Sequence, residues 1–551
     1  MRNACHRLVR GTVAISIGLF VGVSGAPAKD INVPADQPTI QQGIDIAADG
    51  DVVLVAPGTY VENIDFKGKA ITVQGSGGPQ VTTIDGGSAD SVVKFQSDER
   101  LDSVLEGFRI THGVASEGGG ILCSGDASPT IRNNVLADNS ASSGGGIFAD
   151  SGSPLLTDNQ LEGNFASGYG GAFYTGYSSW PTVLRCVFLQ NTAGNGGAIE
   201  IEEASECTIE DCIFFENSSA NFAGAIRCDL TDPVIRRNQF LQNTAWSGGA
   251  IYSCISNPEI GANAFRGNTA TQQGGAIHCD LSAPKIRNNS FLGNSAAADG
   301  GAISLFDSWP KIVNGTFHGN TSGTFGGAIY CELSFPDITG SIFWNNQAPA
   351  GPEIHVDSGT ADVIYSDVEG GFSGTGNIDL DPRFTDPFQG DLALLSNSPC
   401  IDAADPSSKP TGRDLAQNPR LLDGDLNQTL RVDMGAYEFG NIHLEITGTP
   451  MLGSTVTIDT TGKPGLFVFF CIGTAPGAVL LPPFGTLYFD LTFPWVAPPF
   501  LVIPASGSAS TDVVVPTSLP APITVIVQEV GIDASGGSGN VSNDLTLTIT
   551  Q

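Results

Sequence analysis

A motif of two glycines, an alanine and an isoleucine, or a near variant of it, recurs along the middle of this 551-residue chain at intervals of 25–27 residues. Its last residue falls at Ile121, Ile147, Phe173, Ile199, Ile226, Ile251, Ile277, Ile303 and Ile329. A Phe-x-x-Asn motif keeps the same period and ends at Asn191, Asn217, Asn243, Asn268, Asn294, Asn320 and Asn346. A constant period in two motifs identifies a repeat protein, in which the unit decides the fold.

Each unit is rich in Gly, Asn and Ser, and its apolar residues form short clusters with a period of two, as in Ile226-x-Cys228. That pattern predicts short strands separated by turns rather than pairs of helices. A unit of this length suits one coil of a three-sided parallel solenoid, in which each motif stacks on its copy roughly 4.8 Å away. A β-propeller blade needs four strands and a longer unit. The sequence therefore predicts an all-β chain built on a right-handed parallel β-helix.

The repeat also predicts which side chains face inward. The Ile, Phe and Ala of the motifs would form interior ladders, because each coil of a solenoid buries its core against its neighbours. The glycine pair permits left-handed backbone, and the short Asn amide can hydrogen-bond to backbone groups at a turn. Four cysteines two residues after the repeat Ile are expected to be small core residues, namely Cys123, Cys228, Cys279 and Cys331.

These repeats resemble those of known right-handed β-helices of the pectin-lyase-like superfamily. The Gly-Gly-Ala-Ile and Phe-x-x-Asn signatures are similar to those of chlamydial polymorphic outer-membrane proteins. The resemblance covers roughly half of the chain. It implies the β-helix fold, and it implies little about activity because one fold can host many functions.

The N-terminal region has two parts. Residues 1–28 predict a signal peptide, because three arginines precede the apolar run Val13–Val23 and Ala26–Ala28 has the small-x-small pattern of a cleavage site. Residues 29–105 predict an N-terminal cap and the first coils, with a helix over 40–48 capped by Thr39. The order of residues here is similar to the opening of many pectin-lyase-like β-helices, in which the helix plugs the open end of the solenoid.

Three further segments complete the organisation. Residues 106–363 hold the repeat array. Residues 364–440 lose the period and are expected to form terminal coils or a C-terminal cap; they resemble the C-terminal module of bacterial surface β-helix proteins whose anchoring tail varies ("choice-of-anchor" proteins). Residues 441–551 are rich in Pro, Phe, Val and Thr with alternating short strands, which predicts a small Ig-like β-sandwich.

The chain is strongly acidic. It has 24 Lys and Arg against 57 Asp and Glu, a net charge of −33, and loss of residues 1–28 would remove only cations. That charge argues against nucleic acid as a partner and could recruit Ca²⁺. Asp423, Asp425 and Asn427 have the spacing of the first ligands of a calcium loop, yet Gln428 and Met434 stand where its Gly and Glu belong. A solvated acidic turn is the favoured interpretation of that segment.

Cys186 and Cys212 each lie five residues before an Asn of the repeat. They therefore occupy the same position in neighbouring coils. One strand spacing is within the Cα–Cα range of a disulfide, and disulfides form in exported proteins. We expect this pair to be the bridge that the chain forms if it forms one.

If the repeat Ile points inward, the residues one and three positions after it point outward. Those columns bring carboxylates, a cation, an imidazole and aromatic rings to one face of the middle coils. The acid/base, charge-stabilising or metal-binding candidates are Glu200, Glu202, Arg227, Asp229, His278 and Asp280. The rings that could stack on a glycan are Phe148, Tyr174, Tyr252 and Tyr330.

Two functions remain open from the sequence. The first is an exported structural or adhesive surface protein that presents a long repetitive face, with polysaccharide or a cell-surface glycan as its partner. The second is a carbohydrate-active enzyme, a polysaccharide lyase or a glycoside hydrolase. The sequence lacks the Asp-Asp and Gly-His-Gly signatures of polygalacturonases and the Trp-x-Asp-His of pectate lyases. The near-constant period also leaves no insertions that would wall a groove, so the first function is favoured.

Overall fold

The structure is a computed structural model of the chain. It describes residues 28–439, apart from 178, 204–205, 396, 409–412, 417, 419, 423 and 425–428, and beyond residue 439 it describes the strands between 443 and 549. The predicted signal peptide and calcium-loop residues Asp423, Asp425 and Asn427 lie outside the described residues.

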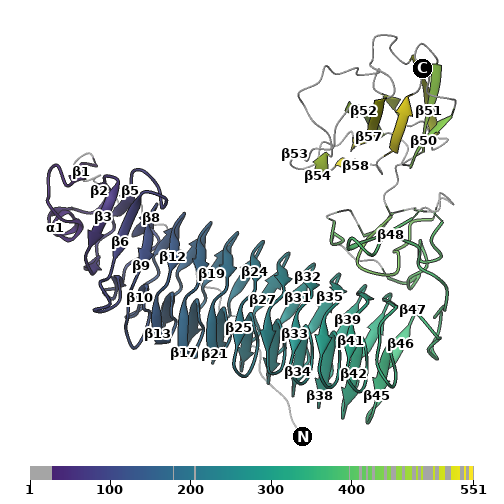
Figure 1. The fold of residues 1–551 in the computed structure, drawn as a ribbon, viewed down its shortest axis with the longest axis horizontal. Coiled ribbons are helices and arrows are strands. Elements are labelled where there is room, and N and C mark those ends of the chain that lie inside the picture. The colour runs from purple at the N-terminus through teal and green to yellow at the C-terminus, as the bar shows by residue number, and fades with distance from the viewer. Residues whose placement is uncertain are drawn as a thin grey trace, which may run out of the picture.

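The described chain is a parallel β-helix, seen as a row of coils in Figure 1. The fold prediction is confirmed, but the coil has four sheets instead of three. From the coil of residues 130–150 onward, the chain passes through sheets A, B, D and C in turn before it enters the next coil. Every neighbouring strand pair within these sheets is parallel, so each residue stacks on its equivalent in the next coil.

Sheet A has 14 strands. They are β1 (Asp30–Val33), β2 (Val52–Val55), β5 (Thr72–Gly75), β8 (Val104–Glu106), β11 (Thr130–Arg132), β15 (Leu155–Thr157), β19 (Thr182–Leu184), β23 (Thr208–Glu210), β27 (Val234–Arg236), β31 (Glu259–Gly261), β35 (Lys285–Arg287), β39 (Lys311–Val313), β43 (Asp337–Thr339) and β46 (Asp362–Ile364).

Sheet B has 13 strands, and its outer side carries the pocket described below. They are β3 (Gly58–Val61), β6 (Thr82–Asp85), β9 (Arg109–Thr111), β12 (Val135–Ala137), β16 (Gln160–Glu162), β20 (Val187–Leu189), β24 (Ile213–Phe215), β28 (Gln239–Leu241), β32 (Ala264–Arg266), β36 (Ser290–Leu292), β40 (Thr316–His318), β44 (Ile342–Trp344) and β47 (Asp367–Val368).

Sheet C has 12 strands, and from β10 to β42 each begins at the last residue of the glycine-pair motif. They are β4 (Ile64–Asp65), β7 (Val93–Phe95), β10 (Ile121–Cys123), β14 (Ile147–Asp150), β18 (Phe173–Gly176), β22 (Ile199–Glu202), β26 (Ile226–Asp229), β30 (Ile251–Cys254), β34 (Ile277–Asp280), β38 (Ile303–Phe306), β42 (Ile329–Glu332) and β45 (Ile354–Val356).

Sheet D is the side that the sequence did not predict. Its eight short strands lie between the repeat Asn and the glycine pair: β13 (Ser140–Ser143), β17 (Phe165–Tyr169), β21 (Thr192–Asn195), β25 (Ser218–Ser219), β29 (Thr244–Ala245), β33 (Thr269–Ala270), β37 (Ser295–Ala296) and β41 (Thr321–Ser322).

The interior consists of the predicted ladders. The repeat Ile, Phe and Ala side chains and the four inward cysteines are buried. Seven phenylalanine rings, from Phe188 on β20 to Phe343 on β44, stack with centroids 4.5–4.9 Å apart and planes within 7° of parallel. Dense apolar contact of this kind supplies most of the stability of a solenoid coil.

The asparagine column is a continuous hydrogen-bonded ladder. From Asn139 to Asn346, each side-chain amide donates to the side-chain oxygen of the next coil's Asn at 2.8–3.1 Å. The same amide also donates to a backbone carbonyl of the preceding coil. The ladder ends on Glu353, whose carboxylate accepts from the backbone and side-chain amides of Asn346. Each amide thus satisfies buried backbone groups at a turn.

The glycine pair makes the bend between sheets D and C. The first glycine has a positive φ in most coils, for example 66° at Gly248. The second is approached so closely by backbone that a Cβ on Gly249 would lie 2.1 Å from the carbonyl oxygen of Gly275. Glycine is required at both positions for these two separate reasons.

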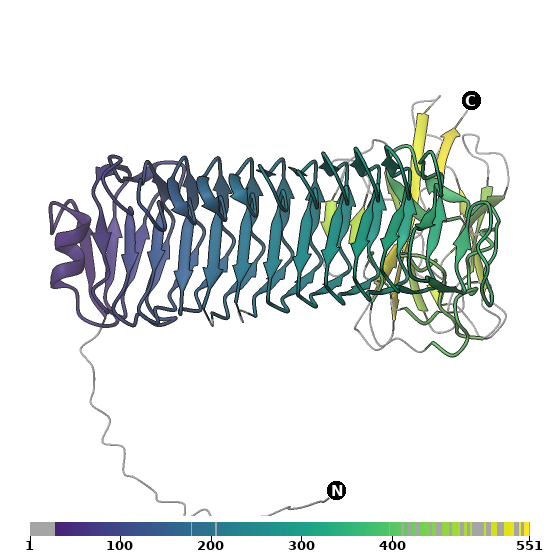
Figure 2. The same ribbon diagram turned by 90° about the horizontal axis from the view of Figure 1, so that it is seen from below.

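The ends of the rod are covered. Helix α1 (Ile40–Ile46) lies at the N-terminal end (Figure 2), and its N-terminus is capped by Thr39, whose Oγ1 accepts from the Gln42 amide at 3.2 Å. Ile40 and Ile44 of this helix are buried. At the other end Phe372 packs against the core, and Asn377 bonds to Ser366 and Val363 of the last coil.

The chain then leaves the coil axis and runs back beside sheet B (Figures 1 and 2). This segment, residues 378–439, is called the return module; it contains the antiparallel pair β48 (Phe384–Asp386) and β49 (Asp391–Leu394). Its apolar residues form a second small core with Ile342 of β44. The Ala436 amide donates to Thr316 Oγ1 of β40 at 2.8 Å, so the module is fixed to the outer side of sheet B.

Beyond residue 439 the described strands pair antiparallel, in two main groups and one hairpin. They are β50 (His443–Thr447), β51 (Thr455–Thr461), β52 (Leu466–Gly473), β53 (Val479–Leu481), β54 (Gly485–Leu487), β55 (Leu501–Val502), β56 (Ser508–Val514), β57 (Ile523–Asp533), β58 (Gly539–Val541) and β59 (Leu545–Ile549). The Ig-like sandwich stays a prediction.

Candidate functional site

The predicted outward columns of sheet C exist in the expected register. One column of paired residues in successive strands consists of Glu200, Arg227, Tyr252 and His278, and the other consists of Glu202, Asp229, Cys254 and Asp280. The sequence therefore placed these side chains on one face correctly. It did not predict their burial.

An ion cluster lies at β22 and β26. The Arg227 guanidinium bonds Glu200 Oε1 at 2.5 Å and Asp229 Oδ2 at 2.7 Å, and lies 3.6 Å from Glu202 Oε1. Glu200 has no exposed surface, and its Oε2 has no hydrogen-bond partner. Burial raises the pKa of Glu200 well above its usual range, and the attraction of Arg227 opposes that shift. These groups hold one another, which is the arrangement of a structural ion cluster.

The rings on this face pack against neighbouring rings, and at Tyr252 and Tyr330 these neighbours, Phe222 and Phe325, come from the turn that follows sheet D. The four predicted glycan-stacking residues, Phe148, Tyr174, Tyr252 and Tyr330, are only 5–6% exposed. Tyr252 is stacked against His278 on one side, with centroids 5.1 Å apart, and contacts Phe222 at 4.4 Å. These rings are therefore largely buried, and their role as glycan-binding residues stays a prediction.

The remaining polar groups of that face are also engaged or buried. The Tyr174 hydroxyl donates to Glu202 at 2.9 Å, and the Tyr252 hydroxyl donates to Asp280 at 3.3 Å. Burial lowers the pKa of His278 to about 4, so this imidazole is neutral near pH 7. A buried neutral His with an unpartnered Nδ1 is poorly placed to carry protons to and from a ligand.

Cys186 and Cys212 lie in a second amide ladder that the sequence analysis missed. Its asparagines are Asn134, Asn159, Asn238, Asn263 and Asn289, all buried and spaced by the same period. The two cysteines fill the coils between Asn159 and Asn238. Both are free thiols in the structure, and the Cys186 amide donates to Cys212 Sγ at 3.4 Å. The predicted bridge is absent, and Sγ replaces the amide oxygen as acceptor.

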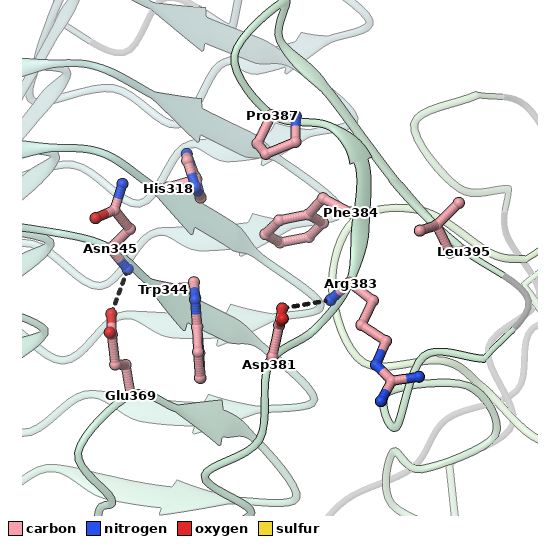
Figure 3. A pocket seen from close by; sticks show the side chains of 9 residues that line it. All are labelled: His318, Trp344, Asn345, Glu369, Asp381, Arg383, Phe384, Pro387 and Leu395. Atoms are coloured by element: carbon pink, nitrogen blue, oxygen red, sulfur yellow. Dashed lines mark hydrogen bonds between the residues drawn. The ribbon is translucent and has the colours of Figure 1, made fainter.

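A pocket of about 400 Å³ opens between the outer side of sheet B and the return module (Figure 3). His318 on β40 and Trp344 on β44 form its floor, and Glu369, Asp381, Arg383 and Phe384 come from the chain that follows the last coil. Its volume is within the range of small-molecule sites. A second hollow, lined by Arg100, Leu101, Asp102, Ser128 and Ser153, has no aromatic ring.

The polar groups of the pocket are fixed in position. Glu369 accepts from the Asn345 amide at 2.6 Å, and Asp381 accepts from the Arg383 amide at 2.9 Å through one oxygen, which leaves its other oxygen available. The Arg383 guanidinium donates to the Asn397 carbonyl at 3.2 Å. In Figure 3 the Trp344 ring lies between Glu369 and Asp381. An aromatic ring thus lies between two carboxylates at a half-open surface, and the Arg383 guanidinium extends away from the ring.

His318 completes the pocket floor. Its ring meets Phe384 edge-on at 5.6 Å, and its Nδ1 is buried without a partner. Burial lowers the pKa of His318, and the negative charge of Glu369 opposes the shift. The imidazole is therefore neutral near pH 7, able to donate through one nitrogen and accept through the other.

The comparisons with known proteins agree with the parallel β-helix fold. Residues 69–240 match the right-handed β-helix region family. Residues 264–280, 290–305 and 314–332 match the Chlamydia polymorphic membrane protein repeat. No curated protein matches the chain.

One solved structure with a similar fold is a mutant of the PL6 family alginate lyase AlyGC. It is 16% identical, with a TM-score of 0.42, and the match covers 67% of this chain and 55% of the lyase chain. At that distance the likeness concerns the path of the backbone only. This chain therefore matches little more than half the length of that lyase.

The described residues show neither a metal-binding cluster nor a membrane-spanning helix. Across the described residues, no group of three or more His, Cys, Asp and Glu side chains is arranged to hold a metal ion. Within the same part of the chain, no helix has the length and apolar character needed to cross a membrane.

Proposed function

We propose that this chain is an exported surface protein whose β-helix carries a saccharide-binding pocket beside its last coils. The observation that carries the proposal is the grouping of Trp344, Asp381, Glu369 and Arg383 around one half-open pocket. A saccharide presents an apolar ring face and a rim of vicinal hydroxyls. The indole can cover the first, and charged planar groups can bond pairs of the second.

The pocket suits a short, uncharged part of a glycan. Two carboxylates against one guanidinium make its lining net negative, which disfavours a polyanionic chain. One ring stacked on Trp344 would leave the rest of the glycan outside the pocket, because it opens along the surface of the module. This geometry fits recognition of a glycan end or branch by a surface adhesin.

Export and surface location belong to the same proposal. The signal-peptide pattern of residues 1–28 and the match to polymorphic membrane protein repeats support it. The proposed partner is a polysaccharide or cell-surface glycan, and the rod would hold the pocket away from its point of attachment.

The alternative is a carbohydrate-active enzyme, a polysaccharide lyase or a glycoside hydrolase. Asp381 and Glu369 favour it, because two carboxylates in one pocket can act as acid and base. On sheet C the acidic candidates Glu200, Glu202 and Asp229 are instead bound to Arg227. The catalytic alternative therefore places its active site in the same pocket as the binding proposal, and one set of variants tests both functions.

The test is a glycan array probed with the purified chain, followed by calorimetric titration of each glycan retained. Trp344→Ala should weaken binding at least tenfold, as expected for loss of a ring stacked on a sugar. Asp381→Asn should weaken it less and leave the fold intact. Trp180→Ala removes a tryptophan that is 54% exposed and lies outside the pocket, so it is the matched control. Equal affinity in all four proteins would refute the site.

Incubation of the same glycans with the chain, with and without Ca²⁺, decides between binding and catalysis. Intact glycan supports the binding function. New reducing ends or unsaturated products that disappear in Asp381→Asn would establish the enzyme.

A further inference from the structure

A row of large apolar side chains is exposed along the turn that joins sheet C to sheet A. This row, called the apolar ridge, consists of Leu230, Ile255, Leu281, Trp309, Leu333 and Phe335, which are 46–51% exposed. They occupy five successive coils, so neighbours are about one strand spacing apart. Trp309 and Phe335 lie with their planes 8° apart and their centroids at 6.3 Å.

Four ridge residues hold a backbone conformation that their side chains disfavour. Leu230, Ile255, Leu281 and Leu333 have φ of 49–55°, in the left-handed region. That region is strained for bulky residues and above all for a β-branched one such as Ile255. The equivalent left-handed positions after sheets A and B, from residue 133 to 345, carry Gly, Asn, Asp, Glu, Gln, Arg or Ala. Among the described residues from 133 to 345, strain and apolar exposure thus coincide at this turn only, which points to a functional surface.

We infer that the apolar ridge is the contact through which two copies of this chain pair side by side. The aliphatic centre of the ridge has no group that could bond sugar hydroxyls, and a chain of charge −33 is repelled by anionic lipid. A second copy carries the same row with the same spacing, so the side chains of one ridge can interdigitate with those of the other.

The area is sufficient for such a pair. A fully exposed large side chain presents roughly 200 Å², so six half-exposed side chains contribute roughly 600 Å² per copy. Two copies then bury roughly 1,200 Å², the lower end of the range for specific interfaces. Tyr177 and Trp180 hold the same two turn positions in an earlier coil, 55% and 54% exposed, and would enlarge the contact.

The inferred pairing has a characteristic dependence on salt. The two rods are both strongly acidic, so their long-range repulsion opposes association and is screened at physiological ionic strength. The dimer should therefore tighten as salt rises. An interface held by ion pairs would weaken instead.

The test is sedimentation velocity of the purified chain from residue 29 onward, at 1–100 µM and at low and physiological salt. A concentration-dependent dimer that strengthens with salt is the expected result. In the double variant Ile255→Asn/Leu281→Asn the dissociation constant should rise at least 100-fold. Asn tolerates the left-handed conformation, so the variant monomer should melt no lower than the wild type, which separates lost pairing from misfolding.

Gln242→Asn is the matched control, because Gln242 is exposed and left-handed but lies in the turn after sheet B. It should leave the dimer unchanged. A wild-type chain that stays monomeric throughout, or a dimer that persists in the double variant, would overturn the inference. So would binding of the monomeric chain to vesicles or glycans that the double variant abolishes, since it would assign the ridge to another partner.

Discussion

The asparagine ladder should be the most sensitive polar feature of the rod, and Asn268→Ala tests it. The side chain of Asn268 accepts from the backbone and side-chain amides of Asn243, at 3.1 and 2.9 Å. It donates to the Phe240 carbonyl and to Asn294, both at 2.9 Å. Asn243, Asn268 and Asn294 are all fully buried. Alanine removes all four hydrogen bonds at once and has no polar atom to replace them.

The cost follows from the groups left without partners. The Asn243 backbone amide loses its acceptor on Asn268, and the Phe240 carbonyl loses one donor; each buried hydrogen bond lost in this way costs about 1–3 kcal/mol. The Asn243 side chain still donates to the Phe214 carbonyl, so it adds little. The sum is about 4 kcal/mol, equivalent to roughly a 1,000-fold increase in local opening, since about 1.4 kcal/mol corresponds to a factor of ten.

Hydrogen exchange resolved by mass spectrometry is the appropriate assay, because coils of a solenoid can open without unfolding the whole. Amides of β28 to β36 should lose roughly 1,000-fold of their protection, while those of β12 and β16 keep theirs. Gln242→Ala, at an exposed residue beside Asn243, is the control and should change neither. A loss below tenfold in the middle coils would refute the claim that the ladder stabilises the stack.

Three further predictions concern stability. Phe265→Ala should cost about 3–5 kcal/mol in urea unfolding, because the ring is stacked on both faces at 4.7 and 4.9 Å; a cost below 1 kcal/mol would contradict the ring ladder. Burial raises the pKa of Glu353 to about 7. The stability tied to this carboxyl is therefore present below its usual pKa near 4.5 and is lost as the pH rises towards 7. Glu353→Gln should flatten the plot of unfolding free energy against pH in that range, and an unchanged plot would exclude Glu353 as its source. Burial lowers the pKa of His278 to about 4. The stability tied to its neutral form is therefore lost as the pH falls from 6.5 towards 4. NMR should show a neutral imidazole at pH 5, and a charged imidazole there would disprove its burial.

The fold was predictable because every repeat unit has the same pattern of short strands and turns. Equivalent Ile, Phe and Asn residues of successive units lie next to one another in a parallel stack, so the pattern predicted a parallel β-helix. Sheet D escaped prediction because its strands are two to five residues long and mostly small or polar, as in Ser218–Ser219. Such segments have no alternation of apolar residues to detect.

The candidate site shows a different limit. The register of Glu200, Arg227 and Asp229 followed from counting, but the complete burial of Glu200 did not. The pocket joins His318 and Trp344 of sheet B to Glu369 after the last coil and to residues 381–395 of the return module, and no spacing links these segments. One signal was available: the outward column of sheet B contains Phe215, Leu241, Leu292 and Trp344, which is unusually apolar for a solvent face and indicates that something covers it.

The measurement that tests the proposed function most directly is a crystal structure of the chain with the oligosaccharide it binds most tightly. The proposal predicts a sugar ring against Trp344 with hydroxyls bonded to Asp381 and Glu369. Density for the sugar on sheet C or along the apolar ridge, with the pocket empty, would contradict it.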